Sequence, residues 1–198
     1  PKKGNTLWEN PWLKMGLDAN GFPNYILKSF EIATKYATNI KLVYNHNGGM
    51  QPKMWDKVKE TILYARSQGH RVDAIGWQGH IKLSGTTKGF IEDTENTLQQ
   101  LSELVDWAHA NNLEFHITEL DYKITDKSNI KEEHLIQAKL YSKLVSLLES
   151  KTSTGVVVLN LWDMGERFKR NTGYFQSIYD AYLNPTPAYQ IIKNALKN

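Results

Sequence analysis

The segment Leu113–Asp121, LEFHITELD, decides the fold because it joins an apolar strand pattern to a cluster of polar side chains. Three other short runs rich in Val, Ile and Leu have the same design: Ile40–Tyr44, Val72–Trp77 and Gly155–Leu161. Longer segments with apolar residues at helical spacing surround these runs: Asn24–Tyr36, Pro52–Gln68, Gly89–Ala110, Lys131–Glu149 and Pro187–Leu196. This alternation predicts an α/β fold in which helical crossovers join parallel strands.

The composition is that of an ordinary folded domain. With 198 residues, 40% of them hydrophobic and 23% charged, the chain is long enough for one core and is not a disordered protein. The net charge of +3, with both signs interspersed, argues against a nucleic-acid partner. No apolar run approaches the about 20 residues that span a bilayer, so no membrane association is expected. The absence of cysteine excludes disulfides and thiolate chemistry.

Each predicted strand runs directly into polar side chains. Asn45 follows the first strand, Gln78 and His80 follow the second, Glu119 and Asp121 end the third, and the fourth ends in Asn160-Leu161-Trp162. In parallel α/β folds the chemistry collects at the carboxyl ends of the strands. We therefore expect an active site at this edge of the sheet.

The alternation of side chains along a strand predicts which of these residues share a face. Glu119 and Asp121 have the parity of Phe115 and Ile117, an apolar set suited to a barrel interior, whereas His116 should point towards the helices as a packed side chain. A carboxylate at the open end of an apolar barrel, near a histidine and a second carboxylate, is a candidate nucleophile. Taken alone, Glu119 fits equally well as a solvated carboxylate at a strand end.

Five motifs in a fixed order resemble family-10 glycoside hydrolases, the endo-β-1,4-xylanases. Ile117–Asp121 matches the nucleophile motif ITELD of that family, and Val72–His80 (VDAIGWQGH) is similar to its strand IDGIGxQxH. Tyr44-Asn45 matches the opening of its segment YNDYN, Pro187–Tyr189 matches the KPAY start of its last helix, and Gly4–Trp12 resembles its loop GxLRxSxW. The match stays in register from Gly4 to Leu196, nearly the whole chain.

This resemblance implies a (β/α)8 barrel of which residues 1–198 form the C-terminal half, with strands five to eight and the helix before them. It makes Glu119 the nucleophile of a retaining mechanism, oriented and kept ionised by His80 and Asp121. It assigns sugar contacts to Tyr44, Asn45, Gln78 and Trp162. No metal or cofactor is implied, and the implied substrate, xylan or xylo-oligosaccharide, suggests a secreted, cell-surface or periplasmic protein.

The resemblance also implies a missing acid/base glutamate. In the family this residue precedes the loop that Gly4–Trp12 matches, so we expect it upstream of Pro1, on the N-terminal half of the barrel. Glu9, Asp163 and Glu166 are weaker candidates. We therefore expect the fragment alone to be inactive and prone to associate.

Some positions depart from the family pattern. His46 and Asn47 replace its usual Asp and Tyr, Asp163 replaces a Gly, Glu166 an Asp, and Arg170 a Trp. These changes leave the nucleophile motif intact but alter the aromatic walls of the sugar site.

Two other functions remain open. The chain could be an inactive half-barrel that binds carbohydrate, which the altered loop after Trp162 favours and the retention of Glu119, His80 and Asp121 opposes. It could also be a related barrel hydrolase acting on mannan or cellulose. A metal site is not indicated, because no histidine pair has i, i+4 spacing on a helix, and no glycine-rich motif indicates a nucleotide.

Overall fold

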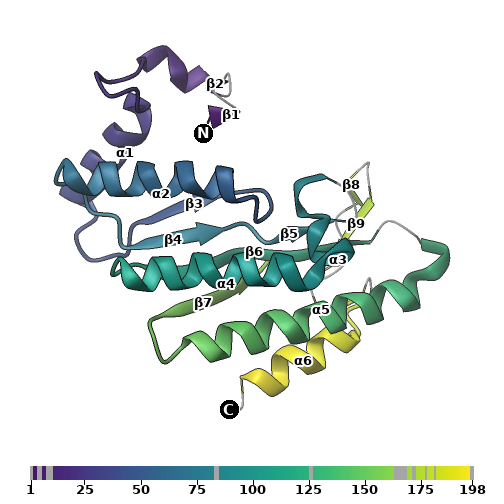
Figure 1. Cartoon of the computed structure of the whole chain (residues 1–198). Coiled ribbons are helices and arrows are strands. Elements are labelled where there is room, and N and C mark those ends of the chain that lie inside the picture. Colours follow the sequence, from purple (N-terminus) through teal and green to yellow (C-terminus); the bar gives the residue numbers. More distant parts are fainter. Residues whose placement is uncertain are drawn as a thin grey trace.

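A parallel sheet and its covering helices form the body of the chain (Figure 1). The computed structural model describes residues 2–3, 6–7, 11–82, 85–124, 127–162, 169–170, 173–176, 178–180 and 182–196; residues 2–3, 6–7, 127, 169–170 and 173–176 are described by their backbone alone. Parallel pairing gives the strand order β3 (Val43–His46), β4 (Ala74–Trp77), β6 (Glu114–Ile124) and β7 (Val157–Leu161).

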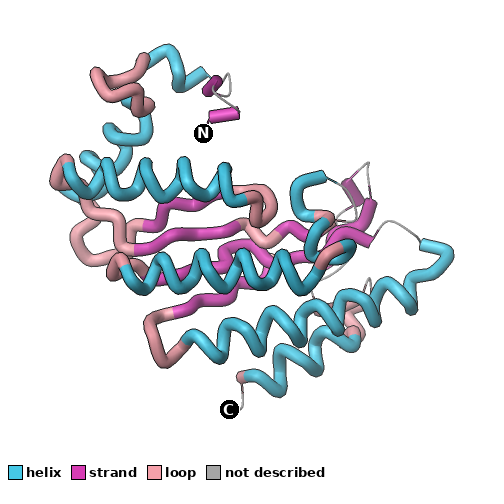
Figure 2. The backbone as a smooth tube through the Cα atoms, viewed as in Figure 1, coloured by secondary structure: helices cyan, strands magenta, loops and turns pink. Residues whose placement is uncertain are grey.

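Helices lie along one face of this sheet, as Figure 2 shows. They are α1 (Asn24–Tyr36), α2 (Pro52–Ser67), α3 (Gly89–Glu92), α4 (Thr94–Ala110), α5 (Ile130–Lys151) and α6 (Pro187–Ala195). Short 3-10 turns cover Pro11–Met15, Gly85–Thr87 and Lys127–Asn129, and β1 (Lys2–Lys3) pairs with β2 (Thr6–Leu7) near the N-terminus. The predicted alternation of strands and helices is confirmed.

The predicted helix Gly89–Ala110 is interrupted at one residue. Asp93 has φ −142° and ψ 62°, outside the helical region, and this divides the segment into α3 and α4. The Thr94 hydroxyl donates to the carbonyl of Phe90, so a side chain satisfies a helical carbonyl at the break. The apolar spacing predicted the helix, but it contains no signal for this interruption.

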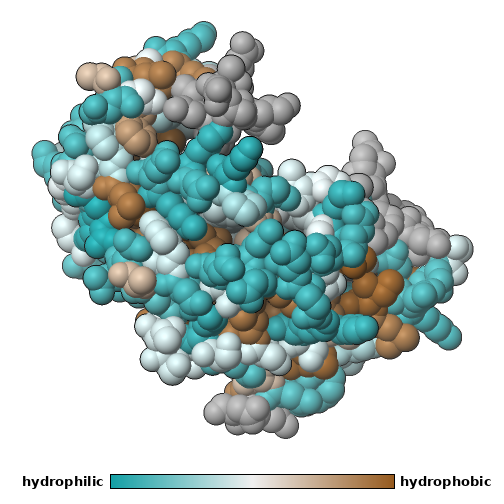
Figure 3. All heavy atoms as spheres, viewed as in Figure 1, coloured by the Kyte–Doolittle hydropathy of each residue, from teal (hydrophilic) through white to brown (hydrophobic). Residues whose placement is uncertain are grey.

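The core lies between the sheet and its helices. The side chains of Phe115 and Ile117 in β6 are fully buried in one cluster with residues of α2, α4 and α5, among them Ile62, Leu101, Val105, Tyr141 and Leu144. The outer faces of α2 and α4 are mostly hydrophilic in the space-filling view (Figure 3). No helix in the described ranges is both long and apolar enough to cross a membrane.

A β-bulge in β6 overturns the predicted alternation of faces. Exposure alternates regularly up to Ile117, but the pairing with β7 shifts between Ile117 and Leu120, so that Thr118 and Glu119 are both partly exposed. The expectation that Glu119 shares the face of Ile117 is therefore wrong. The expectation for His116 is also wrong, because its Nε2 lies 2.9 Å from Oε2 of Glu114 on the face opposite the helix-packed side chains.

The bulge also carries β6 into a second, smaller sheet that the sequence did not indicate. Beyond it, β6 pairs in parallel with β5 (His80–Ile81) and antiparallel with β9 (Gly173–Gln176), which pairs in turn with β8 (Lys169–Arg170). The site residues of β6 therefore lie at the junction of two sheets.

Candidate active site

Two neighbouring strands bring the polar residues together at the junction of the sheets. After β4 ends, the backbone N–H of Gln78 donates to the carbonyl of His46, and that of Asp121 donates to the carbonyl of Gly79. A Cβ on Gly79 would lie 3.0 Å from Cγ2 of Ile117 and 3.1 Å from Cδ1 of Leu120. Glycine thus allows this segment to approach β6 closely, which places Gln78 and His80 beside Glu119.

The Glu119 carboxylate is held by a hydrogen bond at each oxygen. Gln78 Nε2 donates to Oε1 at 2.9 Å, and His80 Nε2 lies 3.0 Å from Oε2. The side chain of Glu119 is 18% exposed, so one part of the group is still accessible from solvent. Two such contacts fix the carboxylate in one orientation.

His80 lies between two carboxylates. Its Nδ1 is 2.9 Å from Oδ1 of Asp121, whose side chain is 1% exposed, while its Nε2 faces Glu119. The hydrogen bond that His80 donates to Asp121 is the largest cause that raises the pKa of His80, and partial burial opposes it. An acceptor oxygen at each ring nitrogen favours the charged imidazolium, which can donate both of its N–H groups.

An exposed indole lies next to this group. Trp162, at the end of β7, is 39% exposed, and its ring is 6.0 Å from that of His80 at an interplanar angle of 84°. Its backbone N–H donates to the carbonyl of Leu120, which anchors it beside the bulge. The indole offers an apolar surface on which the C–H face of a sugar could pack.

Asn45 reaches the same edge from β3. Its side chain is exposed, and its Oδ1 lies 2.9 Å from Oγ1 of Thr118, the residue before Glu119. A Cβ on Gly76 would lie 2.9 Å from this oxygen, so glycine leaves the space that Asn45 uses. Thr118 was not among the predicted site residues, although its place beside Glu119 in the strand was a signal for it.

The comparison with known sequences now decides the family. The sequence profile described as "Glycosyl hydrolase family 10" matches residues 5–195. The chain belongs to this family. The resemblance predicted from the sequence motifs is therefore confirmed.

The relatives of this family-10 chain are longer than the chain itself. Endo-1,4-beta-xylanase A of Caldicellulosiruptor saccharolyticus is 27% identical over 174 residues, which cover 84% of this chain and 46% of that protein. Endo-1,4-beta-xylanase 1 of Humicola insolens is 24% identical over 87% of this chain and 39% of its own length. The chain thus spans less than half the length of these two curated relatives.

Solved structures show the same fold. Xylanase 10B from Thermotoga petrophila RKU-1, in complex with xylobiose, superposes with a TM-score of 0.78 at 22% identity, covering 97% of this chain and 55% of that one. An endo-1,4-beta-xylanase from Caldicellulosiruptor owensensis gives 0.76 at 21%, covering 98% and 59%. Because these structures are (β/α)8 barrels, the predicted fold class is confirmed, and the parallel sheet of this chain is part of such a barrel.

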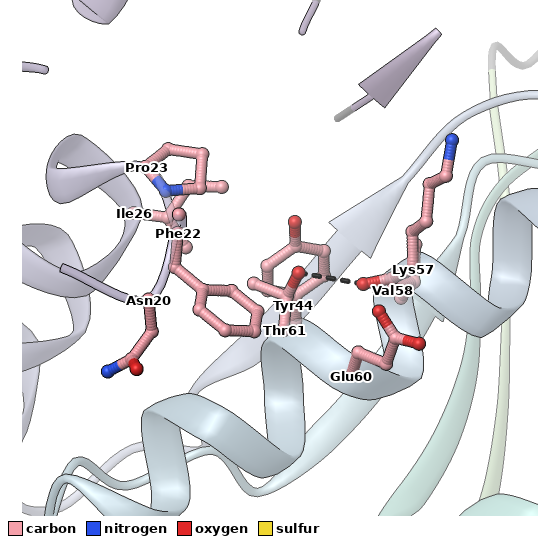
Figure 4. A pocket seen from close by; sticks show the side chains of 10 residues that line it. Asn20, Phe22, Pro23, Ile26, Tyr44, Lys57, Val58, Glu60 and Thr61 are labelled. Atoms are coloured by element: carbon pink, nitrogen blue, oxygen red, sulfur yellow. Dashed lines mark hydrogen bonds between the residues drawn. The ribbon is translucent and has the colours of Figure 1, made fainter. Parts of the chain in front are cut away.

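Tyr44 is the one predicted sugar contact that the structure places elsewhere. Its side chain is 9% exposed and stacks on Phe30 of α1 with ring centroids 5.9 Å apart, and burial raises its pKa to about 12. It lines a cavity of about 60 Å³ between α1 and α2, where the Thr61 hydroxyl donates to the carbonyl of Lys57 (Figure 4). The expectation for Tyr44 is corrected, since its neighbour Asn45 takes the face of β3 that leads to the site.

Several residues singled out in the sequence cannot be placed. Glu9, Asp163 and Glu166 lie outside the described residues, and only the backbone of Arg170 is described. Within the described part of the chain, no group of three or more His, Asp and Glu residues is arranged to hold a metal ion.

Proposed function

We propose that this chain carries the nucleophile of a retaining endo-β-1,4-xylanase, with Glu119 in that role. The observation that carries the proposal is the Glu119 carboxylate held by Gln78 and by His80, with His80 held in turn by Asp121. A nucleophilic carboxylate must be ionised and correctly aimed before it attacks. A histidinium between two carboxylates meets both needs, because it stabilises negative charge on Glu119 and fixes its direction.

The proposed reaction has two steps. An oxygen of Glu119 attacks the anomeric carbon, the glycosidic C–O bond breaks, and a general acid protonates the departing oxygen. Water then cleaves the glycosyl ester, with the same acid group now acting as base. The Gln78 amide can both donate and accept further hydrogen bonds, and Asn45 and Trp162 offer polar and apolar contacts to the sugar.

The general acid has to be a second, accessible carboxyl group. Asp121 does not suit this role, because its side chain is 1% exposed and bound to His80. We therefore propose that the acid/base glutamate comes from residues upstream of this chain, which is the C-terminal half of the barrel. Loss of general acid catalysis typically costs about 10²–10⁴-fold, so we expect little activity from residues 1–198 alone.

The two edge strands of the main sheet are consistent with pairing to further strands of the barrel. Among the described strands, β3 pairs only with β4, and β7 pairs only with β6, so each has an edge on which a further strand could pair. We propose that the N-terminal half of the barrel pairs there. Without it we expect the chain to associate, which light scattering of the isolated chain would reveal.

Xylan and xylo-oligosaccharides are the proposed substrates. The support is family membership together with relatives that are named as xylanases and a solved structure in complex with xylobiose. Because such a substrate is a polymer, we propose a secreted, cell-surface or periplasmic protein. Mannan or cellulose, and binding without hydrolysis, are the alternatives to be tested.

The test is xylan hydrolysis by the chain combined with its upstream half. We expect Glu119→Gln to lower kcat by about 10³-fold or more while the fold is kept, because an amide cannot attack as a carboxylate does. Glu114→Gln, at the first residue of the same strand, is the matched control and should keep its activity. Trapping the enzyme with a 2-fluoro-xyloside and locating the adduct by mass spectrometry would identify the nucleophile directly.

Three outcomes would count against the proposal. Full activity in Glu119→Gln would remove this residue from the mechanism. Faster hydrolysis of mannan or cellulose than of xylan would indicate another substrate. Tight xylo-oligosaccharide binding without any hydrolysis by the combined halves would favour the binding module.

A further inference from the structure

A buried hydrogen bond joins β6 to α5 immediately beyond the site. The Tyr122 hydroxyl donates to Oε2 of Glu133 at 2.7 Å, the Tyr122 side chain is fully buried, and Glu133 is 5% exposed. Burial raises the pKa of Tyr122, and the hydrogen bond to Glu133 raises it further. The pair therefore consists of a neutral phenol and an acceptor in the first turn of α5.

This hydrogen bond has an energetic reason to persist. A buried carboxylate is costly unless it accepts hydrogen bonds, and a bond to an ionised group is stronger than one between neutral groups. The start of a helix also favours negative charge, which suits Glu133 at its position in α5. If the bond broke, the buried Glu133 carboxylate would lose a hydrogen bond that offsets the cost of its burial. The pair therefore holds β6 and α5 together.

The hydrogen bond to Glu133 holds Tyr122, the residue that follows Asp121 in β6. Beyond the bulge, Asp121 lies opposite His80 and Tyr122 lies opposite Ile81 in the pairing of β6 with β5. That pairing covers only these two positions in β5, and the pairing of β6 with β9 begins only at Tyr122, so among the described strands Asp121 itself is paired with β5 alone. Holding Tyr122 from the helix side would steady this part of β6 just where the Asp121 carboxylate meets the histidine.

A second α5 residue lies near the same carboxylate. Tyr141 is fully buried, and the negative charge of Asp121 adds to the effect of burial in raising its pKa. The helix therefore packs against the strand that carries Glu119 and Asp121. We therefore expect a displacement of α5 relative to β6 to shift the Asp121 carboxylate.

We infer that Tyr122 and Glu133 are positioning residues that keep the Asp121 carboxylate within hydrogen-bond distance of His80 Nδ1. The catalytic importance of this geometry rests on the proposed function, in which Glu119, His80 and Asp121 act together. The geometry itself does not depend on activity. It can therefore be tested by observing His80 directly.

The experiment is a pH titration of the combined barrel halves in which this chain carries ¹⁵N-histidine, with the His80 resonances assigned through a His80→Gln variant. Tyr122→Phe and Glu133→Leu each remove the hydrogen bond, from opposite sides, and Glu133→Leu leaves no buried charge behind. In both we expect the His80 pKa to fall towards that of an ordinary histidine and its downfield Nδ1 proton resonance to be lost. Glu133→Gln, which keeps an acceptor for Tyr122, is the matched control and should titrate like the wild type.

Thermal unfolding of each variant shows which ones are folded. The test needs only one of Tyr122→Phe and Glu133→Leu to be folded. An unchanged His80 titration in a folded Tyr122→Phe or Glu133→Leu chain would overturn the inference and leave only a structural hydrogen bond. A shift in Glu133→Gln as large as that in Glu133→Leu would also overturn it, because the acceptor would then be irrelevant. Retained xylan hydrolysis in Glu119→Gln would refute the proposed function without changing this result.

Discussion

His80 Nδ1 lies 2.9 Å from Oδ1 of Asp121 while its Nε2 lies 3.0 Å from Oε2 of Glu119. A neutral imidazole has only one N–H, so it can satisfy one carboxylate and must turn a lone pair towards the other. Only the charged ring donates to both. The protonation of His80 therefore determines whether both carboxylates keep their hydrogen bonds to the ring.

The first prediction concerns the alkaline side of the pH profile. The folded pKa of His80 is raised, so the ring donates to both carboxylates at lower pH and loses one of these two hydrogen bonds as the pH rises through that pKa. Because the hydrogen bond to the Asp121 carboxylate is the largest cause of the shift, Asp121→Asn should move the alkaline limb of kcat/KM for xylan to lower pH. The profile is measured on the combined barrel halves.

Glu114→Gln is the control for this profile, since Glu114 contacts His116 and Lys41 rather than His80. Its alkaline limb should coincide with that of the wild type. An alkaline limb that stays in place in a folded Asp121→Asn enzyme would show that another group controls it.

The second prediction concerns acid stability and rests on His46. This side chain is 8% exposed, packs edge-on against Trp55, and its Nε2 has no hydrogen-bond partner among the described residues. Burial lowers its pKa to about 4 from 6.5. The folded state therefore binds this proton less readily than the unfolded state, and stability falls as the pH drops from about 6.5 to 4, by on the order of 3 kcal/mol.

The variant His46→Phe keeps an aromatic ring against Trp55 and removes the titrating group. Its free energy of unfolding, measured in urea at a series of pH values, should fall less steeply than that of the wild type between pH 6.5 and 4. Parallel curves for the two proteins would show that His46 does not cause the acid loss.

The hydrophobic pattern predicted the main sheet and its helices because each strand and helix has its own apolar repeat. The alternation along β3 could also have separated Tyr44 from Asn45, since adjacent strand residues point to opposite faces. The bulge at Glu119 could not be predicted in this way, as neither glycine nor proline marks it within Ile117–Asp121. The pairing of His80 with Asp121 depends on a two-residue strand, too short to leave a pattern.

The third prediction concerns the close approach of two loops at Gly49. A Cβ at this position would lie 1.8 Å from the carbonyl oxygen of Thr86, which also accepts a hydrogen bond from Gln51 Nε2. Gly49→Ala should therefore separate the loops and destabilise the chain by about 2 kcal/mol or more. Gly69→Ala is the comparison, because Gly69 has open space around it and only its φ of 80° opposes a side chain.

Both variants are compared by urea unfolding. Gly69→Ala should cost about 1 kcal/mol, the usual penalty of a left-handed backbone for alanine. If Gly49→Ala were no more destabilising than Gly69→Ala, the loop at Thr86 would be able to move away from an added Cβ at little cost, and the prediction would be wrong.

The last prediction follows from a turn that occurs twice, each time in front of a helix. Before α1, Asp18 Oδ1 accepts the backbone N–H groups of Asn20 and Phe22, and Gly21 has φ 80°. Before α6, Asp180 Oδ1 accepts those of Tyr182 and Asn184. Here Leu183, with φ 63°, holds the position that glycine has in the first turn.

The two turns thus offer a matched pair of substitutions. Gly21→Ala should destabilise the chain by about 1 kcal/mol, because alanine disfavours positive φ and no neighbour lies within 4 Å to compensate. Leu183→Gly should cost nothing or stabilise slightly, since relief of the strained backbone offsets the greater freedom of glycine in the unfolded chain. Leu183 is 47% exposed, so little apolar burial is lost. Thermal and urea unfolding of both variants provide the measurement, and a Leu183→Gly chain destabilised as much as Gly21→Ala would show that Leu183 contributes packing that outweighs its strain.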